Sequence, residues 1–259
     1  MTNPTLPPIP GSPKLSIHAD RPAMGRAAAE HVVALLESIL ASQSAARVIF
    51  ACAPSQDQFL EALIRLSDSR IDWSRVTAFH MDEYVGLSAA HPASFRSYLH
   101  KNLLSKVAVA RFHPIAGEAS NASEECARYA ALIEAAPIDL ICLGIGENGH
   151  LAFNDPPVAD FGDSVSAKVV ELDSACREQQ VHDGCFPRIE DVPRHAITLT
   201  LPVFLRAKHL SVVVPGERKA EAVQRSVQGP ITTECPGSLL QTREQVILFI
   251  DQAAAARLR

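Results

Sequence analysis

Short apolar runs alternate with longer amphipathic segments along most of the chain, and this alternation constrains the fold more than any other feature. The apolar runs predict buried strands at residues 47–52, 75–79, 138–143, 196–199, 210–214 and 246–250. The amphipathic segments predict helices at residues 20–39, 55–64, 93–104, 122–135 and 217–227, with an alanine-rich helix after the last strand. Asp20 and Ser55 are the expected N-caps of the first two helices. This order predicts an α/β fold, a doubly wound and mostly parallel sheet with helices on both faces.

No linker rich in Gly or Ser divides the chain, so we expect a single domain over residues 14–259. Five prolines within residues 1–13 predict an extended N-terminal tail. The chain has 259 residues, of which 47% are apolar and 20% charged, so it can bury a large core. Polar, interrupted stretches at residues 156–165 and 176–193 are typical of lids, and we expect a lid segment there.

Charge and hydropathy exclude several classes of protein. The net charge is −5 and the isoelectric point about 6.1, which argues against a nucleic-acid partner. No apolar run approaches the roughly 20 residues of a membrane span, and no signal pattern precedes the first helix, so we expect a cytoplasmic protein without a membrane partner. The six cysteines are scattered without close pairs, which predicts free thiols rather than a zinc site or disulfides.

Three segments with unusual polar groups directly follow predicted strands: residues 51–56, 80–86 and 144–155. Ligands of open α/β sheets bind beyond the carboxyl ends of the strands, so these segments predict one site. The third segment carries three glycines, which let the backbone approach a ligand closely. It also carries His150, with Asp155 nearby, and this pair is a candidate for acid–base catalysis.

Three other interpretations of these segments are weaker. Gly144, Gly146 and Gly149 fit the Gly-x-Gly-x-x-Gly pattern of dinucleotide sites, but the loop lies in mid-chain and turn residues follow it, so we expect no nicotinamide cofactor. Adjacent acids such as Asp82 and Glu83 are most often solvated loop charges, although here they directly follow a buried strand. His80 and Asp82 lack an obvious third ligand, so we expect no metal.

Three motifs resemble one known family. HMDEYVGLSAAHPASF (residues 80–95), IDLICLGIGENGHLAFNDPP (residues 138–157) and VVVPGERKAEAV (residues 212–223) are similar to the glucosamine-6-phosphate deaminase (isomerase) family in order and spacing. The related 6-phosphogluconolactonases share a Gly-x-Gly-x-x-Gly-His loop, but they continue it with Ser-Leu-Phe-Pro and lack the run at residues 82–86.

The resemblance implies a modified Rossmann-like fold and an enzyme that isomerises and deaminates a 2-amino-2-deoxyhexose 6-phosphate, an amino-sugar phosphate isomerase/hydrolase without a cofactor. It implies that Asp82 moves a proton between C2 and C1, and that His150 assists opening of the sugar ring. Asp155 would orient His150, and Lys219 would bind the phosphate. The chemistry agrees, because one carboxylate can serve two adjacent carbons and a histidine can donate or accept a proton near neutral pH.

Several positions depart from the family pattern. Asn148, which we expect among the catalytic residues with Asp82, His150 and Asp155, stands where many members carry Asp beside the glycine that precedes the catalytic histidine. Asp155 stands where Glu is usual. Residues 51–56 (ACAPSQ) replace the usual Thr-Gly-Gly-Thr-Pro phosphate loop. The arginine that reaches the phosphate from the lid falls near His182 here, with Arg177 one helical turn earlier. The expected substrate-binding residues are Ser55, Gln56, Glu83, Gly146, Gly149, Arg177, His182 and Lys219.

Three functions remain open from the sequence. The leading one is deamination of glucosamine 6-phosphate, or of its galactosamine epimer, to a ketose phosphate and ammonia. Hydrolysis of a phosphorylated lactone would use His150 as the base but would leave Asp82 without a task. A sugar-phosphate sensor is a third candidate, although the tail before the first helix is too short for a helix-turn-helix domain. Self-association into a homo-oligomer is left open.

Overall fold

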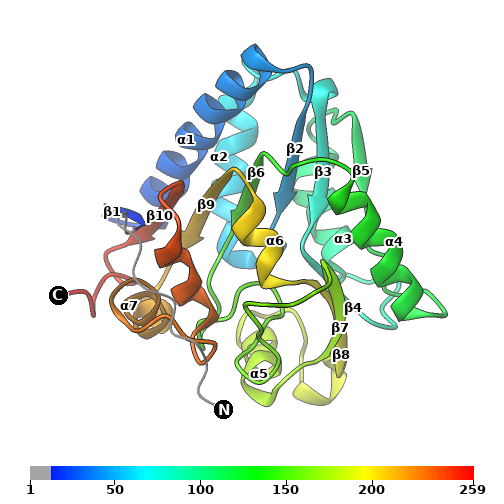
Figure 1. Ribbon diagram of the computed structural model, residues 1–259. Helices are drawn as coiled ribbons and strands as arrows, with labels where there is room; N and C mark the ends of the chain where they lie inside the picture. Colours follow the sequence, from blue (N-terminus) through cyan, green and yellow to red (C-terminus); the bar gives the residue numbers. More distant parts are fainter. Residues whose placement is uncertain (1–12) are drawn as a thin grey trace.

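The computed structural model describes residues 13–259, so residues 1–12 of the predicted tail lie outside the described part. A seven-stranded sheet, parallel throughout, forms its centre (Figure 1). In spatial order its strands are β1 (Lys14–His18), β10 (Val246–Asp251), β9 (His209–Val214), β6 (Leu140–Leu143), β2 (Ala46–Phe50), β3 (Val76–His80) and β5 (Arg111–His113). The parallel sheet predicted from the sequence is confirmed, and β1 and β5 are the strands that the apolar runs did not reveal.

Helices cover both faces of this sheet because its strands are apolar on both sides. One core contains residues of α1 (Arg21–Ser42), α2 (Asp57–Ser67), α3 (Phe95–Leu99) and the π-helical turn η3 (His100–Leu104). The other contains residues of α4 (Ala122–Glu134), α6 (Leu201–Arg206) and α7 (Ala220–Gln228). Alternation along β2 illustrates the division: Val48 and Phe50 join the first core, whereas Ile49 joins the second.

A second, antiparallel sheet of three strands lies below the carboxyl ends of the large one (Figure 1). Its order is β4 (Asp82–Tyr84), β8 (His195–Leu199) and β7 (Ala167–Glu171), and α5 (Ser174–His182) follows β7. One expectation is therefore corrected, because Asp82 and Glu83 lie in a strand rather than a loop. Much of the stretch at residues 176–193 is helical, and the lid expected there stays a prediction. The strand at residues 196–199 is present, but it belongs to this small sheet.

The helices agree with the sequence predictions at some ends and differ at others. Asp20 caps α1 as expected and accepts a hydrogen bond of 2.8 Å from the amide of Ala23. Ser55 caps nothing, because a short 3₁₀ turn precedes α2. The helix expected at residues 93–104 is divided between α3 and η3. The alanine-rich helix after β10 is wrong: residues 252–257 form turns, since a segment this short gains little from helix propagation.

The remaining elements are short 3₁₀ helices: η1 (Pro54–Gln56), η2 (Trp73–Arg75), η4 (Ile189–Asp191), η5 (Glu217–Lys219) and η6 (Pro236–Thr242). None of the helices in residues 13–259 is long and apolar enough to cross a membrane.

The strand order reverses between β2 and β6. From β2 the chain runs outward through β3 to β5, and from β6 it runs outward in the other direction through β9 to β10. The connections leaving β2 and β6 diverge at this point and leave a crevice at the carboxyl ends of the two strands.

Candidate active site

A pocket of about 70 Å³ lies at this reversal point, and we call it the central pocket. Its walls come from the segments after β2, β3, β6 and β9, with α5 of the small sheet's layer closing one side. Segments more than 160 residues apart in the sequence, at Ala51 and Lys219, thus line one cavity. The polar segments after the strands thus line one pocket, as expected, and its role as a functional site stays a prediction.

Asp82 reaches the central pocket from the start of β4. Its side chain is 6% exposed and makes no hydrogen bond or ion pair with the described residues. Burial raises the pKa of this carboxyl well above its usual range, and the nearby carboxylates of Glu83 and Asp155 add to the shift. A carboxylate in this situation accepts a proton readily, which is the property that a general base requires.

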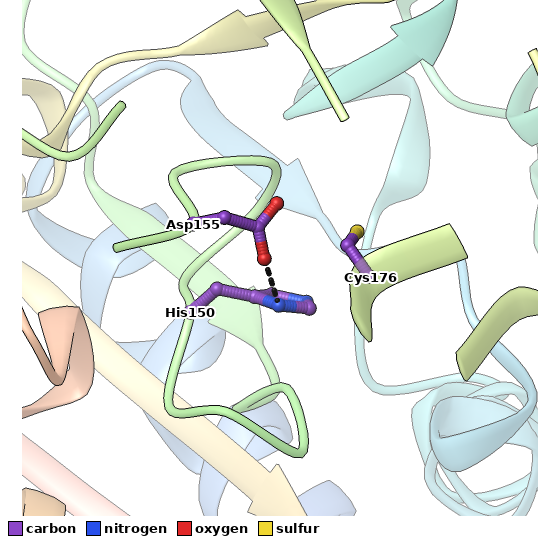
Figure 2. A group of neighbouring side chains, drawn as sticks. All are labelled: His150, Asp155 and Cys176. Carbon is purple, nitrogen blue, oxygen red and sulfur yellow. Dashed lines mark ion pairs between the residues drawn. The ribbon is translucent and has the colours of Figure 1, made fainter. Parts of the chain in front are cut away.

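His150 faces the same pocket from the glycine-rich loop after β6. Its Nδ1 lies 2.8 Å from Oδ1 of Asp155. The dashed line in Figure 2 marks this pair. The amide of Asn148 donates to the same oxygen at 2.8 Å, and the Asn148 carbonyl accepts from the backbone N–H of His150 at 3.0 Å. Burial favours a raised pKa for Asp155, but His150 and Asn148 outweigh it, and the net shift is downward. Asp155 is therefore an anionic partner that fixes the imidazole.

The glycines of this loop make room for the imidazole. A Cβ at Gly146 would overlap the His150 ring, and the backbone amide of Gly146 donates to the His150 carbonyl at 2.9 Å. Gly149 has φ +92° and faces Cys235, whose Sγ would lie 2.6 Å from an added Cβ. Gly146 lines the central pocket, whereas Gly149 shapes the turn behind it. Gly149 was expected to contact substrate, but it is not among the residues that form the pocket wall.

Cys176 of α5 lies beside the His150–Asp155 pair (Figure 2). Ligand atoms of the three residues lie within 4.8 Å of one another, a spacing that could hold a metal ion. Burial and the neighbouring Asp155 raise the pKa of the Cys176 thiol, so the protonated form predominates. Because the thiolate is the form that binds metals, the group is better suited to hydrogen bonding than to coordination.

Lys219, at the end of η5, also lines the central pocket. It is 7% exposed and has no hydrogen-bond or ion-pair partner among the described residues, and burial lowers the pKa of its amine. Ser55 and Gln56 of η1 line the same pocket. Gln56 Nε2 donates to Ser55 Oγ and to the carbonyl of Val213, both at 3.2 Å, which ties η1 to β9.

Besides Gly149, three expected substrate-binding residues lie away from the pocket. Arg177 turns from it and donates to the carbonyls of Ile189 and Val192, at 2.6 and 3.1 Å. His182 is half-exposed, and its Nδ1 lies 4.0 Å from Glu147. The register of α5 explains the difference, because it presents Gln179 and Gln180 to the pocket instead.

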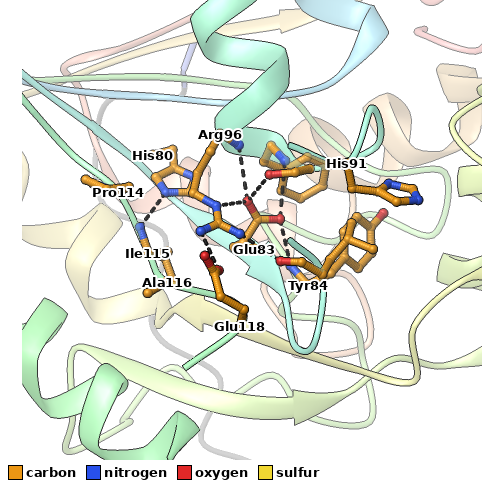
Figure 3. A network of polar contacts seen from close by, with 12 residues as sticks. His80, Glu83, Tyr84, His91, Arg96, Pro114, Ile115, Ala116 and Glu118 are labelled. Atoms are coloured by element: carbon orange, nitrogen blue, oxygen red, sulfur yellow. Dashed lines mark hydrogen bonds and ion pairs between the residues drawn. The ribbon is translucent and has the colours of Figure 1, made fainter. Parts of the chain in front are cut away.

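Glu83 is the third, and Figure 3 shows that it is a structural anchor. Its carboxylate accepts hydrogen bonds from Ser94 Oγ at 2.8 Å and from the Nε and backbone N–H of Arg96 at 3.0 and 3.1 Å. Arg96 in turn pairs with Glu118 at 2.5 Å. The side chain of Glu83 is fully buried and fixes the start of α3 against β4.

Sequence reasoning missed the contribution of α5. Gln179 accepts a hydrogen bond of 2.8 Å from the backbone of Glu147 in the glycine-rich loop, and Gln180 accepts one of 2.8 Å from the hydroxyl of Tyr84. These bonds hold the helix over the central pocket. Two adjacent glutamines give no signal of their own in the sequence, since such a pair is common on solvated helix faces.

Comparison with known proteins agrees with this geometry. Residues 19–249 match the family model of glucosamine-6-phosphate isomerases/6-phosphogluconolactonase. A glucosamine-6-phosphate deaminase of Listeria monocytogenes is 39% identical over 193 residues, 74% of this chain and 80% of that protein. A glucosamine-6-phosphate deaminase of an Exiguobacterium species is 41% identical over 189 residues, 72% of either chain.

Solved structures extend the likeness to almost the whole chain. A monomeric glucosamine-6-phosphate deaminase superposes with a TM-score of 0.87 at 28% identity, covering 95% of this chain and 100% of that one. The 6-phosphogluconolactonase of Trypanosoma brucei has a TM-score of 0.78 at 18% identity over 96% of this chain and 100% of that one, which shows the shared fold. The chain therefore belongs to the family of glucosamine-6-phosphate isomerases and 6-phosphogluconolactonases.

Proposed function

We propose that this protein is a glucosamine-6-phosphate deaminase, which converts the amino-sugar phosphate and water into fructose 6-phosphate and ammonia. One observation supports it above the others: the unpartnered Asp82 carboxylate faces the same small pocket as the His150–Asp155 pair. Isomerisation needs a base that serves two adjacent carbons, and ring opening needs a separate proton carrier. The names of the relatives at 39–41% identity point to the same reaction.

In this proposal His150 acts first. It transfers a proton between the anomeric hydroxyl and the ring oxygen, so that the ring opens to the aldehyde. Asp155, 2.8 Å away, stabilises the imidazolium that forms during the transfer. Asn148 keeps the Asp155 carboxylate in place from behind, which gives the amide a positioning role rather than a contact with substrate.

Asp82 then takes the proton from C2 and returns it to C1. The aldehyde oxygen gains a proton and the amine loses one, so the C1=O double bond of the aldehyde is replaced by the C2=N double bond of an imine. Water adds to this carbon, and the C–N bond breaks to give the ketone and ammonia. The raised pKa of Asp82 suits a group that must accept a carbon-bound proton and then release it.

The phosphate is expected at Lys219 and Ser55, where the buried amine of Lys219 lines the central pocket. A buried lysine without a partner is costly unless a ligand supplies the counter-charge, so the structure favours an anionic group at this end. Gln56 supports Ser55 and has its Oε1 buried without a protein partner.

The test is a direct comparison of substrates with the purified protein. We expect ammonia and fructose 6-phosphate in equal amounts from glucosamine 6-phosphate, with galactosamine 6-phosphate as the epimer control. Hydrolysis of 6-phosphogluconolactone is measured in parallel. Lactone hydrolysis without ammonia release from either amino sugar would overturn the proposal.

A further inference from the structure

A second pocket of about 150 Å³ adjoins the central one, and we call it the outer pocket. The two share Ser55 and Lys219 in their walls, so a ligand that spans them has one end beside Asp82 and the other in the outer pocket. The additional walls come from the first residue of α1, from the turn after β9 and from Asp183 beyond α5. The turn after β9 belongs to the motif at residues 212–223, whereas Arg21 and Asp183 lie outside all three motifs that suggested the function.

The outer pocket needs a second cation if it is to receive a phosphate. A phosphomonoester carries a charge of about −1.5 to −2 near neutral pH, more than Lys219 neutralises alone. Arg177 and His182, the expected sources, lie elsewhere. Arg218 lines the outer pocket, but its guanidinium already faces two carboxylates, Glu147 at 3.4 Å and Asp183 at 3.5 Å.

Arg21 is the remaining cation on this wall. Its Nε lies 4.0 Å from Asp251, and its side chain is 51% exposed, so this ion pair holds it only weakly. Asp251 is already satisfied by other donors: its two oxygens accept from the backbone N–H of Gly216 at 3.0 Å, and one of them accepts from Ala254 at 2.8 Å. The guanidinium therefore keeps donors available for a ligand.

Gly216 allows this position of the arginine. The residue has φ +93°, and an added Cβ would lie 2.7 Å from Nη2 of Arg21. The guanidinium thus lies directly against the turn that leads to Lys219, three residues further along the chain. Asp183 and Glu217 also line the outer pocket. Because their negative charges oppose the binding of an anion, the positive charge of Arg21 matters more there.

We infer that Arg21 is a substrate-binding residue of this chain, which supplies the second positive charge for the substrate's phosphate together with Lys219. The inference rests on the proposed function for the identity of the sugar, but it requires only a phosphorylated ligand. A guanidinium suits the task because its planar donors match two phosphate oxygens at once.

The experiment compares Arg21→Ala with Arg26→Ala, an exposed arginine on the same helix that has no partner among the described residues. For Arg21→Ala we expect KM for glucosamine 6-phosphate to rise roughly 10- to 100-fold, the loss of one charged hydrogen-bonding group, with little change in kcat. Arg26→Ala is expected to behave as the wild type. For Arg21→Lys we expect an intermediate KM, because lysine keeps the positive charge but lacks the planar set of donors of a guanidinium.

Binding measurements separate this inference from the proposed function. If the wild type releases no ammonia, calorimetric titration with glucose 6-phosphate and with glucose replaces the kinetics. Weaker binding of the phosphate ester alone in Arg21→Ala then supports the role of Arg21 although the proposed reaction is wrong. The inference would be overturned if Arg21→Ala and Arg26→Ala had the same KM in the kinetic assay or the same dissociation constant in the calorimetric one. It would also be overturned if the wild type bound glucose 6-phosphate and glucose with equal affinity.

Discussion

Asp82 and His150 share the central pocket but are held in opposite ways. His150 has a buried anionic partner that fixes its ring, whereas the carboxylate of Asp82 has no protein partner at all among the described residues. The first arrangement gives orientation and the second gives basicity. In the proposed reaction the histidine moves a proton between two oxygens of the sugar, which requires a fixed ring, and the carboxylate moves a proton between two carbons, which requires a strong base.

Replacing Asp82 by Asn tests the assigned base and has a consequence for stability. Turnover should fall about 10²–10⁴-fold, because an amide cannot accept the proton. Stability should change in the opposite direction. The folded pKa of Asp82 lies above its unfolded value, so the wild type loses stability as pH rises from the ordinary carboxyl range through the raised pKa. The variant lacks this loss and should be the more stable protein at neutral pH.

Ammonia release and urea unfolding at several pH values measure the two effects. Turnover close to that of the wild type would remove Asp82 from the catalytic residues. A variant that is less stable at neutral pH would contradict the stated origin of the pKa shift.

His150 and Asp155 should behave as one unit. His150→Gln should abolish assisted ring opening, and adding Asp155→Asn should then cost little more, because the carboxylate acts through the imidazole. A double-mutant cycle on kcat/KM, with the folded fraction measured separately, gives the coupling. Additive costs would mean that Asp155 serves only the local fold, and the pair would no longer explain the acid–base step.

At the scale of elements, the glycine-rich loop holds the imidazole by leaving space for it. Gly146→Ala places a methyl group into the His150 ring, so we expect a displaced histidine, a strong loss of kcat and a destabilisation of about 1–3 kcal/mol. Gly162→Ala is the matched control, since its nearest neighbour would lie 3.5 Å away. Activity assays and thermal unfolding compare them. Equal activity in both variants would show that the loop adapts without moving His150.

The start of α3 depends on the buried pair of Glu83 and Arg96. Glu83→Gln removes the charge that neutralises a guanidinium only 8% exposed, so we expect a loss of about 3–5 kcal/mol in the free energy of unfolding. Glu118→Gln removes the partner that is 49% exposed and should cost no more than about 1 kcal/mol. Chemical denaturation of the two variants gives both values. A smaller loss of stability in Glu83→Gln than in Glu118→Gln would contradict the role of Glu83 as a structural anchor.

The same elements show where sequence reasoning works and where it stops. The period of apolar residues and the cap at Asp20 were sufficient for α1 and for the central strands, because both signals are local. Asp82 and Glu83 looked equivalent until strand alternation placed one in the pocket and the other under α3. Arg177 failed for a similar reason, since the register of α5 depends on the contacts of Gln179 and Gln180 rather than on the spacing along the chain.

At the scale of the whole molecule, the site joins the two halves of the sheet. A ligand that spans the two pockets contacts segments that follow β2, β6 and β9, and these strands lie on either side of the reversal point. We therefore expect 2-amino-2-deoxyglucitol 6-phosphate, an open-chain analogue, to stabilise the protein in one cooperative transition. The gain should reach about 2.7 kcal/mol at a hundred times its dissociation constant.

Urea unfolding with and without this analogue measures the gain, and the analogue without its phosphate is the control. Stabilisation of equal size by both compounds at the same concentration would show that the anionic end of the site contributes nothing to binding.

The pairing of β1 with β10 has a consequence for the chain as it is made. The two strands are hydrogen-bonded in register from Lys14 with Ile247 to His18 with Asp251. The first described strand can therefore pair only after a strand more than 200 residues later has been synthesised. Loop closure over such a distance delays this contact, whereas β2, β3 and β5 can assemble from neighbouring segments. Until β10 emerges from the ribosome, β1 has no partner and β9 presents an open, apolar edge. That interval is when the nascent protein is most exposed to aggregation and to chaperones.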